Sequence, residues 1–143
     1  MNQAITTHDD SRIELDRLSE LTEDVLRRCR ARGASEVDVG VGVDVGLSVS
    51  VRLGEIESIE HNRDRGLSLT VYFGKRKGSA STADLNPDSI EKTIEHACAI
   101  ARHTEEDPCN GLADPDLLAH DFADLDLWHP WDISIEEATE LAL

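Results

Sequence analysis

The sequence predicts a two-layer α+β domain, in which a largely antiparallel sheet of about five strands carries two main helices on one face. Residues 37–81 alternate between apolar and polar side chains, which is typical of strands with one covered and one open face. The segments at about 12–32 and 87–103 instead repeat apolar residues every three or four positions, as amphipathic helices do. Because each helix has one apolar stripe, packing both on the apolar face of the sheet is the economical arrangement.

The first predicted helix covers about residues 12–32. Residues 1–10 are polar and carry no period, so we expect a disordered lead-in there. Ser11 followed by Glu14 matches a capping box, and Gly33 stands where helices often end in a left-handed residue. The apolar stripe consists of Leu15, Leu18, Leu21, Val25, Leu26 and Cys29.

The first two strands are predicted at 37–43 and 47–53, where valine or leucine alternates with glycine and polar residues. Gly46 and Gly54 follow these runs, and we expect each glycine to turn the chain.

The third predicted strand, 55–61, breaks the alternation because Ile56 and Ile59 stand three positions apart. A β-bulge between the two isoleucines would place both on the core face. The sequence NRDRG at 62–66 is rich in residues that tolerate positive φ, so it predicts a turn before a fourth strand at 67–73.

A further turn is predicted at 74–78, GKRKG, before a short fifth strand at 79–82. Asn86 followed by Pro87 is typical of an N-cap and a first helical position, so the second helix is expected to run from there to about His103. Its buried stripe is predicted to be Ile90, Ile94, Ala97, Cys98 and Ala101.

Beyond the second helix the sequence loses its regular period. Residues 114–119 suggest one short helical turn, and the aromatic residues of this region either cover the end of the core or face a partner. Ser134 and Glu137 form a second capping box and predict a helix that runs to the last residue without a C-cap pattern. We therefore expect a fragment of a longer chain, divided into a lead-in at 1–10, an α+β domain at 11–104, an acidic irregular segment at 105–133 and the start of a truncated helix at 134–143. The aromatic residues in question are Phe122, Trp128 and Trp131.

The formal net charge of −16 disfavours nucleic acid and anionic membranes as partners, because the field of the protein repels phosphate groups. Twelve acidic residues and no lysine or arginine lie within 104–143. This acidic stretch is either an ordinary solvated surface or a surface that attracts cations or a basic partner. No secretion signal or membrane-spanning run is present in the sequence, and the three cysteines lack a CxxC pattern, so we expect a cytoplasmic protein with reduced thiols.

No pattern of catalytic or metal-binding residues stands out. The six histidines form no HExxH motif, and His96 and His103 are two helical turns apart, roughly 10 Å along the axis. No cysteine or serine has a histidine at a catalytic spacing, and no serine lies in a nucleophile elbow. We therefore predict no catalytic residue and no metal ligand in this chain.

Four runs of sequence carry a resemblance to a known family: SVSVRLGEIESIE, GLSLTVYFGKRKGSASTADL, AIARHTEEDPCNGLADPDLLA and DLDLWHPW. They follow one another at matching spacing and resemble the N-terminal region of the TldD/PmbA family, specifically its PmbA (TldE) branch. The resemblance covers about residues 18–143.

The resemblance implies a heterodimeric cytoplasmic metallopeptidase, in which a PmbA-like and a TldD-like subunit enclose an active site that accepts unfolded peptides. Associated roles are maturation of a peptide antibiotic, breakdown of an antitoxin and an older description as a modulator of DNA gyrase. In that family the zinc ligands, an HExxxH motif and a cysteine, belong to the C-terminal half of the TldD branch. No position of this sequence matches them, so zinc is expected in the TldD-like partner and no cofactor in this chain.

The resemblance and the alternation together suggest where a peptide or partner would make contact. The polar face or an open edge of the sheet would hold an extended peptide by backbone pairing. The basic residues at 75–77 form either a solvated turn or a contact for an acidic patch. The candidate contact residues are Ser48, Ser50, Arg52, Ser68, Thr70, Tyr72, Lys75, Arg76 and Lys77. The alternative function is a free-standing acidic interaction module without a role in proteolysis.

Overall fold

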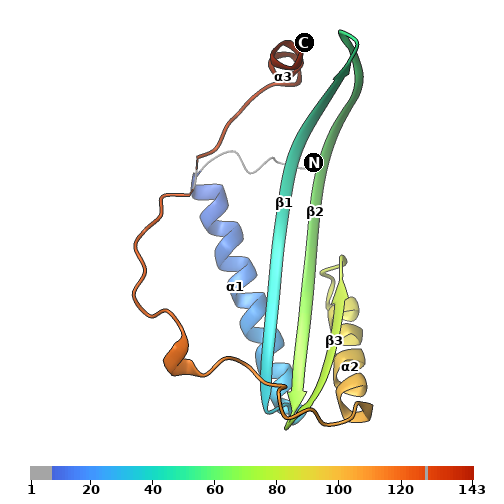
Figure 1. Cartoon of the computed structure of the whole chain (residues 1–143), viewed down its shortest axis with the longest axis vertical. Helices are drawn as coiled ribbons and strands as arrows, with labels where there is room; N and C mark the ends of the chain where they lie inside the picture. Colours follow the sequence, from blue (N-terminus) through green and yellow to red (C-terminus); the bar gives the residue numbers. More distant parts are fainter. Residues whose placement is uncertain (1–7, 128) are drawn as a thin grey trace.

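The computed structural model describes residues 8–127 and 129–143, and of residues 8–12 the backbone alone. Two helices and a three-stranded sheet form the body, and a third helix lies beside the far end of the sheet (Figure 1). The α+β class is therefore confirmed. The elements are α1 (His8–Ala31), β1 (Glu36–Arg52), β2 (Glu55–Phe73), β3 (Arg76–Thr82), α2 (Pro87–His103), the 3₁₀ turn η1 (Pro115–Leu117) and α3 (Ile135–Ala142).

The sheet has the order β1-β2-β3, and both pairings are antiparallel. β1 and β2 form one long hairpin that is paired from Glu36 with Tyr72 up to Arg52 with Glu55. β3 pairs with the lower part of β2 alone and ends opposite Leu67. Beyond that point β1 and β2 continue as a two-stranded ribbon, which rises well past β3 and α2 in Figure 1. We call residues 43–65 the distal ribbon.

The predicted strand count of about five is wrong, because two predicted turns are continuous strand. Gly46 lies inside the ladder opposite Asn62, and a Cβ at Gly46 would come within 2.7 Å of the Asn62 side-chain oxygen. The glycine at this position therefore lies under a cross-strand side chain and does not turn the chain. The segment 62–66 pairs with β1 throughout, so cross-strand pairing overrides its local preference for a turn.

The turn at Gly54 is confirmed. Leu53 and Gly54 have φ of 54° and 78°, as the two central residues of a type I′ hairpin turn require.

The predicted bulge is also present. The register shifts between Ser50 and Val51, so that Glu57 is the extra residue of β2. Ile56 therefore lies on the same face as the other apolar residues of the ribbon, although it stays 46% exposed.

The core lies between the lower half of the sheet and the two helices. Leu67, Leu69 and Val71 of β2 are at most 1% exposed and pack against Val25 of α1 and Ile94 of α2. The prediction that both main helices cover one face of the sheet is therefore confirmed.

Helix α1 begins at His8, so the predicted start at Arg12, with Ser11 as its cap, is wrong; residues 1–7 of the predicted lead-in lie outside the described residues. Leu15 of the predicted stripe is 63% exposed.

Helix α2 has the predicted bounds, and the Asn86 side chain accepts a hydrogen bond from the backbone N–H of Ser89 at 2.9 Å. All five residues of its predicted stripe are buried. The helix approaches β3 so closely that a Cβ at Gly78 would come within 2.2 Å of the Ala97 carbonyl oxygen. The predicted third helix is present as α3, and its capping box between Ser134 and Glu137 is complete.

Candidate functional site

The predicted contact residues on the sheet share the face that points away from α1 and α2. Alternation along a strand places every second residue on one side, and the register brings Gly40 opposite Ser68 and Asp38 opposite Thr70. The face therefore carries glycine, hydroxyl and charged side chains where the opposite face carries the core. The candidates on this polar face are Ser48, Ser50, Arg52, Ser68, Thr70 and Tyr72.

Near the lower end of the polar face the candidate side chains already have partners. Ser68 donates a hydrogen bond to the Gly40 carbonyl at 3.4 Å, and Thr70 is hydrogen-bonded to Ser79 at 2.9 Å. Tyr72 is 7% exposed, although it lies on the polar face. These residues therefore stabilise the three-stranded part of the sheet and offer little to a ligand.

In the distal ribbon the candidates are more available. The side chains of Ser48 and Ser50 are exposed and form no hydrogen bond within residues 8–127 and 129–143. Arg52 lies next to the hairpin turn and forms an exposed ion pair with Glu57 at 3.3 Å. The upper half of the polar face is therefore the part that is free to contact another molecule.

The basic residues at 75–77 do not form one patch. Lys75 lies in the β2–β3 turn and donates a hydrogen bond to the Asn110 carbonyl at 2.8 Å, while Arg76 pairs with Glu106 at 3.4 Å. Lys77 belongs to β3 and lies on the polar face opposite Tyr72. The first two cations thus fasten the segment after α2 to this end of the sheet, and Lys77 is left exposed.

The sheet also has open edges. β1 has no neighbour on its outer side, and β2 has none from Gly66 to Glu55, within the described part of the chain. Such an edge presents unpaired backbone N–H and C=O groups that pair with an extended peptide.

A groove of about 440 Å³ lies between the distal ribbon and α3. Leu47 and Val49 of β1 face Trp131 and Leu141 across it. Of the other two aromatic residues noted above, Phe122 is 84% exposed and Trp128 lies outside the described residues. Trp131, 74% exposed, therefore lies at this groove and outside the main core, and a partner contact there stays a prediction.

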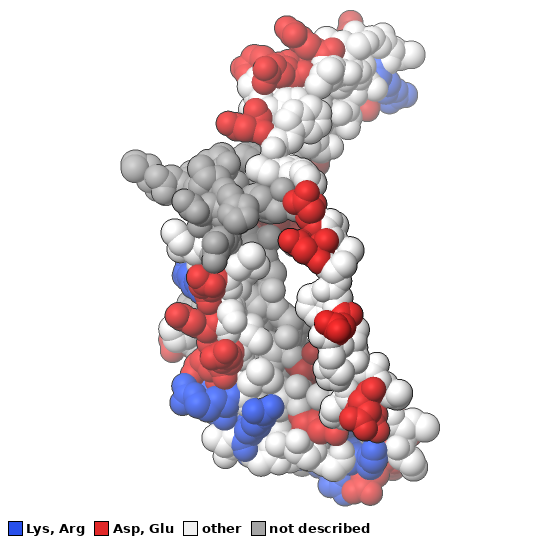
Figure 2. All heavy atoms as spheres, turned by 90° about the vertical axis from the view of Figure 1, so that its left-hand side faces the viewer, with Lys and Arg blue, Asp and Glu red and all other residues white. Residues whose placement is uncertain are grey.

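The acidic segment runs along the outside of the molecule. Carboxylates follow its whole length in Figure 2, from the end near α2 to α3. It is attached near the β2–β3 turn, where the backbone N–H of Leu112 donates to the Glu36 carboxylate at 3.0 Å.

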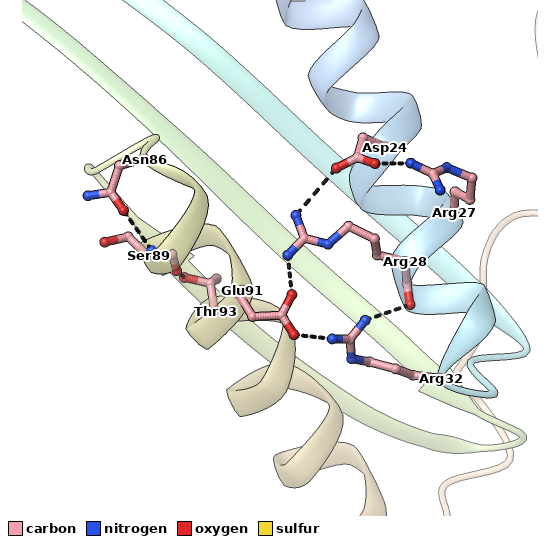
Figure 3. A network of polar contacts seen from close by, with 8 residues as sticks. All are labelled: Asp24, Arg27, Arg28, Arg32, Asn86, Ser89, Glu91 and Thr93. Carbon is pink, nitrogen blue, oxygen red and sulfur yellow. Dashed lines mark hydrogen bonds and ion pairs between the residues drawn. The ribbon is translucent and has the colours of Figure 1, made fainter.

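A polar bridge joins α1 and α2 on the covered face of the sheet. Arg28 of α1 and Arg32, directly after the end of α1, both reach the carboxylate of Glu91 on α2, and Arg28 also contacts Asp24 at 3.3 Å (Figure 3). Hydrogen bonding by Arg28 is the main cause of a lowered pKa for Glu91, although partial burial acts in the opposite direction. The bridge fixes the helices relative to one another, so its role is structural.

The thiols give no sign of a nucleophile. Burial raises the pKa of Cys29 to about 11 and also raises that of Cys98, so both remain protonated near neutral pH. Cys109 is exposed.

Within residues 8–127 and 129–143, no group of three or more histidine, cysteine or acidic side chains is arranged to hold a metal ion. The described residues therefore do not fit the zinc centre that the family resemblance implies. No described helix combines the length and the apolar character needed to cross a membrane.

Sequence reasoning missed two arginines. It assigned Arg63 and Arg65 to a turn and gave them no face, whereas the structure places both on the helix-covered side of β2. The two arginines stand two positions apart with Asp64 between them, and this spacing could have indicated a strand with both arginines on one face.

Comparison with known proteins agrees with this fold. Residues 37–101 match the family described as PmbA/TldA metallopeptidase domain 1. Metalloprotease PmbA of Escherichia coli O157:H7 is 51% identical over 113 residues, which cover 78% of this chain and 25% of that protein. The chain belongs to the TldD/PmbA family. A metalloprotease PmbA homolog of Haemophilus influenzae is also similar to this TldD/PmbA chain, with 48% identity over 112 residues.

Two solved structures share the fold of this TldD/PmbA domain. TldE from Thermococcus kodakarensis matches with a TM-score of 0.60 and 22% identity, over 66% of this chain and 22% of that one. A structure described as a putative modulator of DNA gyrase from Bacteroides thetaiotaomicron matches with a TM-score of 0.67 and 22% identity, over 85% of this chain and 25% of that one. The present chain spans about a quarter of the length of the curated relatives it matches, and it corresponds to their N-terminal domain.

Proposed function

We propose that this chain is the non-catalytic N-terminal domain of a cytoplasmic PmbA-like subunit that pairs with a TldD-like subunit. The pair is a heterodimeric metallopeptidase for unfolded peptides, with its zinc in the TldD-like partner. Peptide antibiotic maturation and antitoxin degradation are the processes proposed for it. The names of the relatives as metalloproteases support the proteolytic setting.

The observation that carries the proposal is the open edge and polar face of the distal ribbon. An unfolded peptide has free backbone groups along its length, and an unpaired strand edge binds such groups without regard to side-chain sequence. Ser48 and Ser50, exposed beside that edge, add side-chain hydrogen bonds. In this arrangement the domain holds the peptide while the partner cleaves it.

The test is peptide cleavage by the reconstituted full-length pair. Replacing both serines, Ser48→Ala and Ser50→Ala, should lower kcat/KM about tenfold, because each lost hydrogen bond contributes roughly 0.5–1.5 kcal/mol. Ser19→Ala, on the exposed surface of α1, is the matched control and should leave cleavage unchanged. Normal cleavage by the double variant, with the subunits still associated in size-exclusion chromatography, would refute the role of this face.

A second candidate function is favoured by the acidic segment alone. Its exposed carboxylates would attract a basic protein without any TldD-like subunit. Salt-sensitive capture of a lysine-rich peptide by this chain, with no TldD-like protein present, would support this function over the first.

A further inference from the structure

A cleft of about 810 Å³ opens between α1, the middle of the sheet and the start of α2. Its floor is Val43 of β1 with Arg63 and Arg65 of β2, directly beyond the buried core residue Leu67. Its volume lies within the range of about 300–1,000 Å³ that is typical of ligand pockets. The cleft is on the opposite side of the sheet from the polar face, so it is independent of the peptide contact proposed above. The walls are Glu14, Arg17, Leu18 and Leu21 of α1 with Asp84, Leu85, Asn86 and Pro87 before and at the start of α2.

The charge of the cleft is opposite in sign to that of the whole protein. Three guanidinium groups line it against two carboxylates, whereas the chain as a whole has a net charge of −16. Both carboxylates interact with neighbouring groups, in part with the cleft arginines themselves. Asp84 accepts hydrogen bonds from the Asn86 backbone N–H at 3.1 Å and the Ser89 hydroxyl at 2.9 Å, and Glu14 lies 3.9 Å from Arg17.

Arg65 is a cation of the cleft that forms no direct ion pair among the described residues, although its charge contributes to the lowered pKa of the nearby Asp84 carboxyl, which hydrogen bonding from the Asn86 backbone N–H causes first. Arg65 forms no ion pair within 4.0 Å with any acidic residue among those the structure describes. Its neighbours along the same face are the apolar residues Val43, its partner across the ladder, and Leu67. An arginine at the border of a core, with its guanidinium hydrogen bonds not used by a direct ion pair, is positioned to receive a second carboxylate besides the nearby Asp84.

The shape of the groups selects the kind of anion. A guanidinium matches a carboxylate through two parallel hydrogen bonds, and it does so better than an ammonium. Leu18, Leu21 and Leu85 give the cleft apolar walls that suit the aliphatic part of a glutamate or a neighbouring apolar residue. Inorganic phosphates suit the site less, because they have no aliphatic part to contact the apolar walls.

We propose that this cleft is a binding site for a glutamate-containing peptide segment, with Arg65 as the anchor of one carboxylate and Arg17 and Arg63 at its sides. Binding there is distinct from cleavage, since the cleft holds no catalytic group among the described residues.

The test is fluorescence anisotropy of a fluorescein-labelled hexapeptide of alternating glutamate and leucine, titrated with the whole protein. Arg65→Gln should weaken binding about tenfold, which corresponds to loss of one charge-assisted pair. Arg65→Lys should fall between the wild-type protein and Arg65→Gln, because the charge remains while the bidentate geometry is lost. Arg30→Gln, at an exposed position near the end of α1 and outside the cleft, is the matched control and should bind like the wild-type protein.

Three outcomes would overturn the proposal. These are equal affinity for a peptide with glutamine in place of glutamate, equal affinity of Arg65→Gln and the wild-type protein, or displacement of the peptide by pyrophosphate at a lower concentration than by free glutamate peptide. Because Arg65 is exposed, its variants should keep the wild-type circular dichroism spectrum, and this confirms that a loss of binding is not a loss of fold. Failure of this test would leave the proposed role of the polar face untouched.

Discussion

At the scale of single residues, the most constrained position is Gly78 of β3. Its missing side chain lets α2 approach until the Ala97 carbonyl oxygen and the Ala101 nitrogen would lie 2.2 and 2.4 Å from a Cβ atom. Both atoms belong to the backbone of a buried helix, so neither can move aside without shifting α2. The contact between α2 and β3 therefore depends on a single glycine.

Gly78→Ala should lower the free energy of unfolding by about 1–3 kcal/mol, the usual cost of overpacking a close contact. Urea unfolding measures the loss. Gly42→Ala is the control, since a Cβ there meets nothing within 4 Å, and it should change stability by less than about 0.5 kcal/mol. Equal effects of the two changes would show that α2 adjusts freely.

Glu91 provides a pH-dependent contribution to stability. Its pKa is lowered in the folded protein, chiefly by hydrogen bonding from Arg28, so the folded state favours the ionised carboxylate. The resulting stabilisation is present above the ordinary glutamate pKa of about 4.3 and is lost as the pH falls through the lower folded value.

Glu91→Gln should therefore reduce stability by about 0.5–1 kcal/mol at pH 7, a small amount because the side chain is 35% exposed. The difference between wild type and variant should shrink as the pH is lowered below about 4 in denaturant titrations. Glu95→Gln, at an exposed position on the same helix, is the control and should change stability at pH 7 by less than about 0.5 kcal/mol. If the difference in stability between wild type and Glu91→Gln stays constant from pH 7 to pH 3, ionised Glu91 is not the source of the stabilisation.

At the scale of elements, the β1–β2 hairpin combines two environments along one ladder. The helices cover its lower half, where Leu67, Leu69 and Val71 are buried. In the distal ribbon the same face is partly open, with Val45 48% and Ile59 43% exposed. The two halves of the hairpin thus have the same backbone pairing, but apolar packing stabilises the lower half more than the distal ribbon.

Amide hydrogen exchange should separate these two halves. Amides at 37–41 and 67–71 should exchange slowly, and amides at 44–52 and 55–64 should exchange at least tenfold faster, because fewer apolar contacts oppose local opening there. Mass spectrometry of the 143-residue chain measures both, with α2 as the protected reference. Equally slow exchange along the whole hairpin would contradict this prediction. It would mean that the distal ribbon opens as rarely as the buried half, although its apolar side chains are partly exposed.

The hairpin also shows how far sequence reasoning reached. Apolar periodicity was sufficient for α2, for the covered face of the sheet and for the bulge near Glu57, because local pattern and tertiary environment agree there. It failed at Gly46 and at NRDRG, where glycine and polar residues usually turn a chain but here pair across the ladder. That second error also hid the cleft, since the face of Arg63 and Arg65 is defined only once the segment is a strand. The candidate contact residues remain predictions.

At the scale of the whole molecule, the dominant property is the uneven distribution of charge. The acidic segment carries carboxylates along its length without a lysine or arginine, while most cations lie on α1, the ribbon and the β2–β3 turn. Self-repulsion of this kind destabilises a compact state and is weakened by salt, as the Debye length falls from about 30 Å at 0.01 M to about 3 Å at 1 M.

Raising sodium chloride from about 0.01 M to about 1 M should therefore raise the Tm of the wild-type chain by a few degrees, roughly 2–4 °C per kcal/mol for a domain near this size. Changing Asp121, Asp124, Asp126 and Asp132 together to asparagine should reduce that response, as measured by differential scanning calorimetry. A salt response of unchanged size in the variant would locate the repulsion elsewhere.

The bulge at Glu57 has a consequence for how the length of this domain can vary over evolution. Loss of this one codon would join Ile56 to Ser58 and leave a regular hairpin, with every other residue on its present face. Loss of any other single residue of β2 within the ribbon would invert all side chains between the deletion and the turn, unless the bulge compensated. Related genes that differ by one codon in this hairpin are therefore expected to differ at or beside this position.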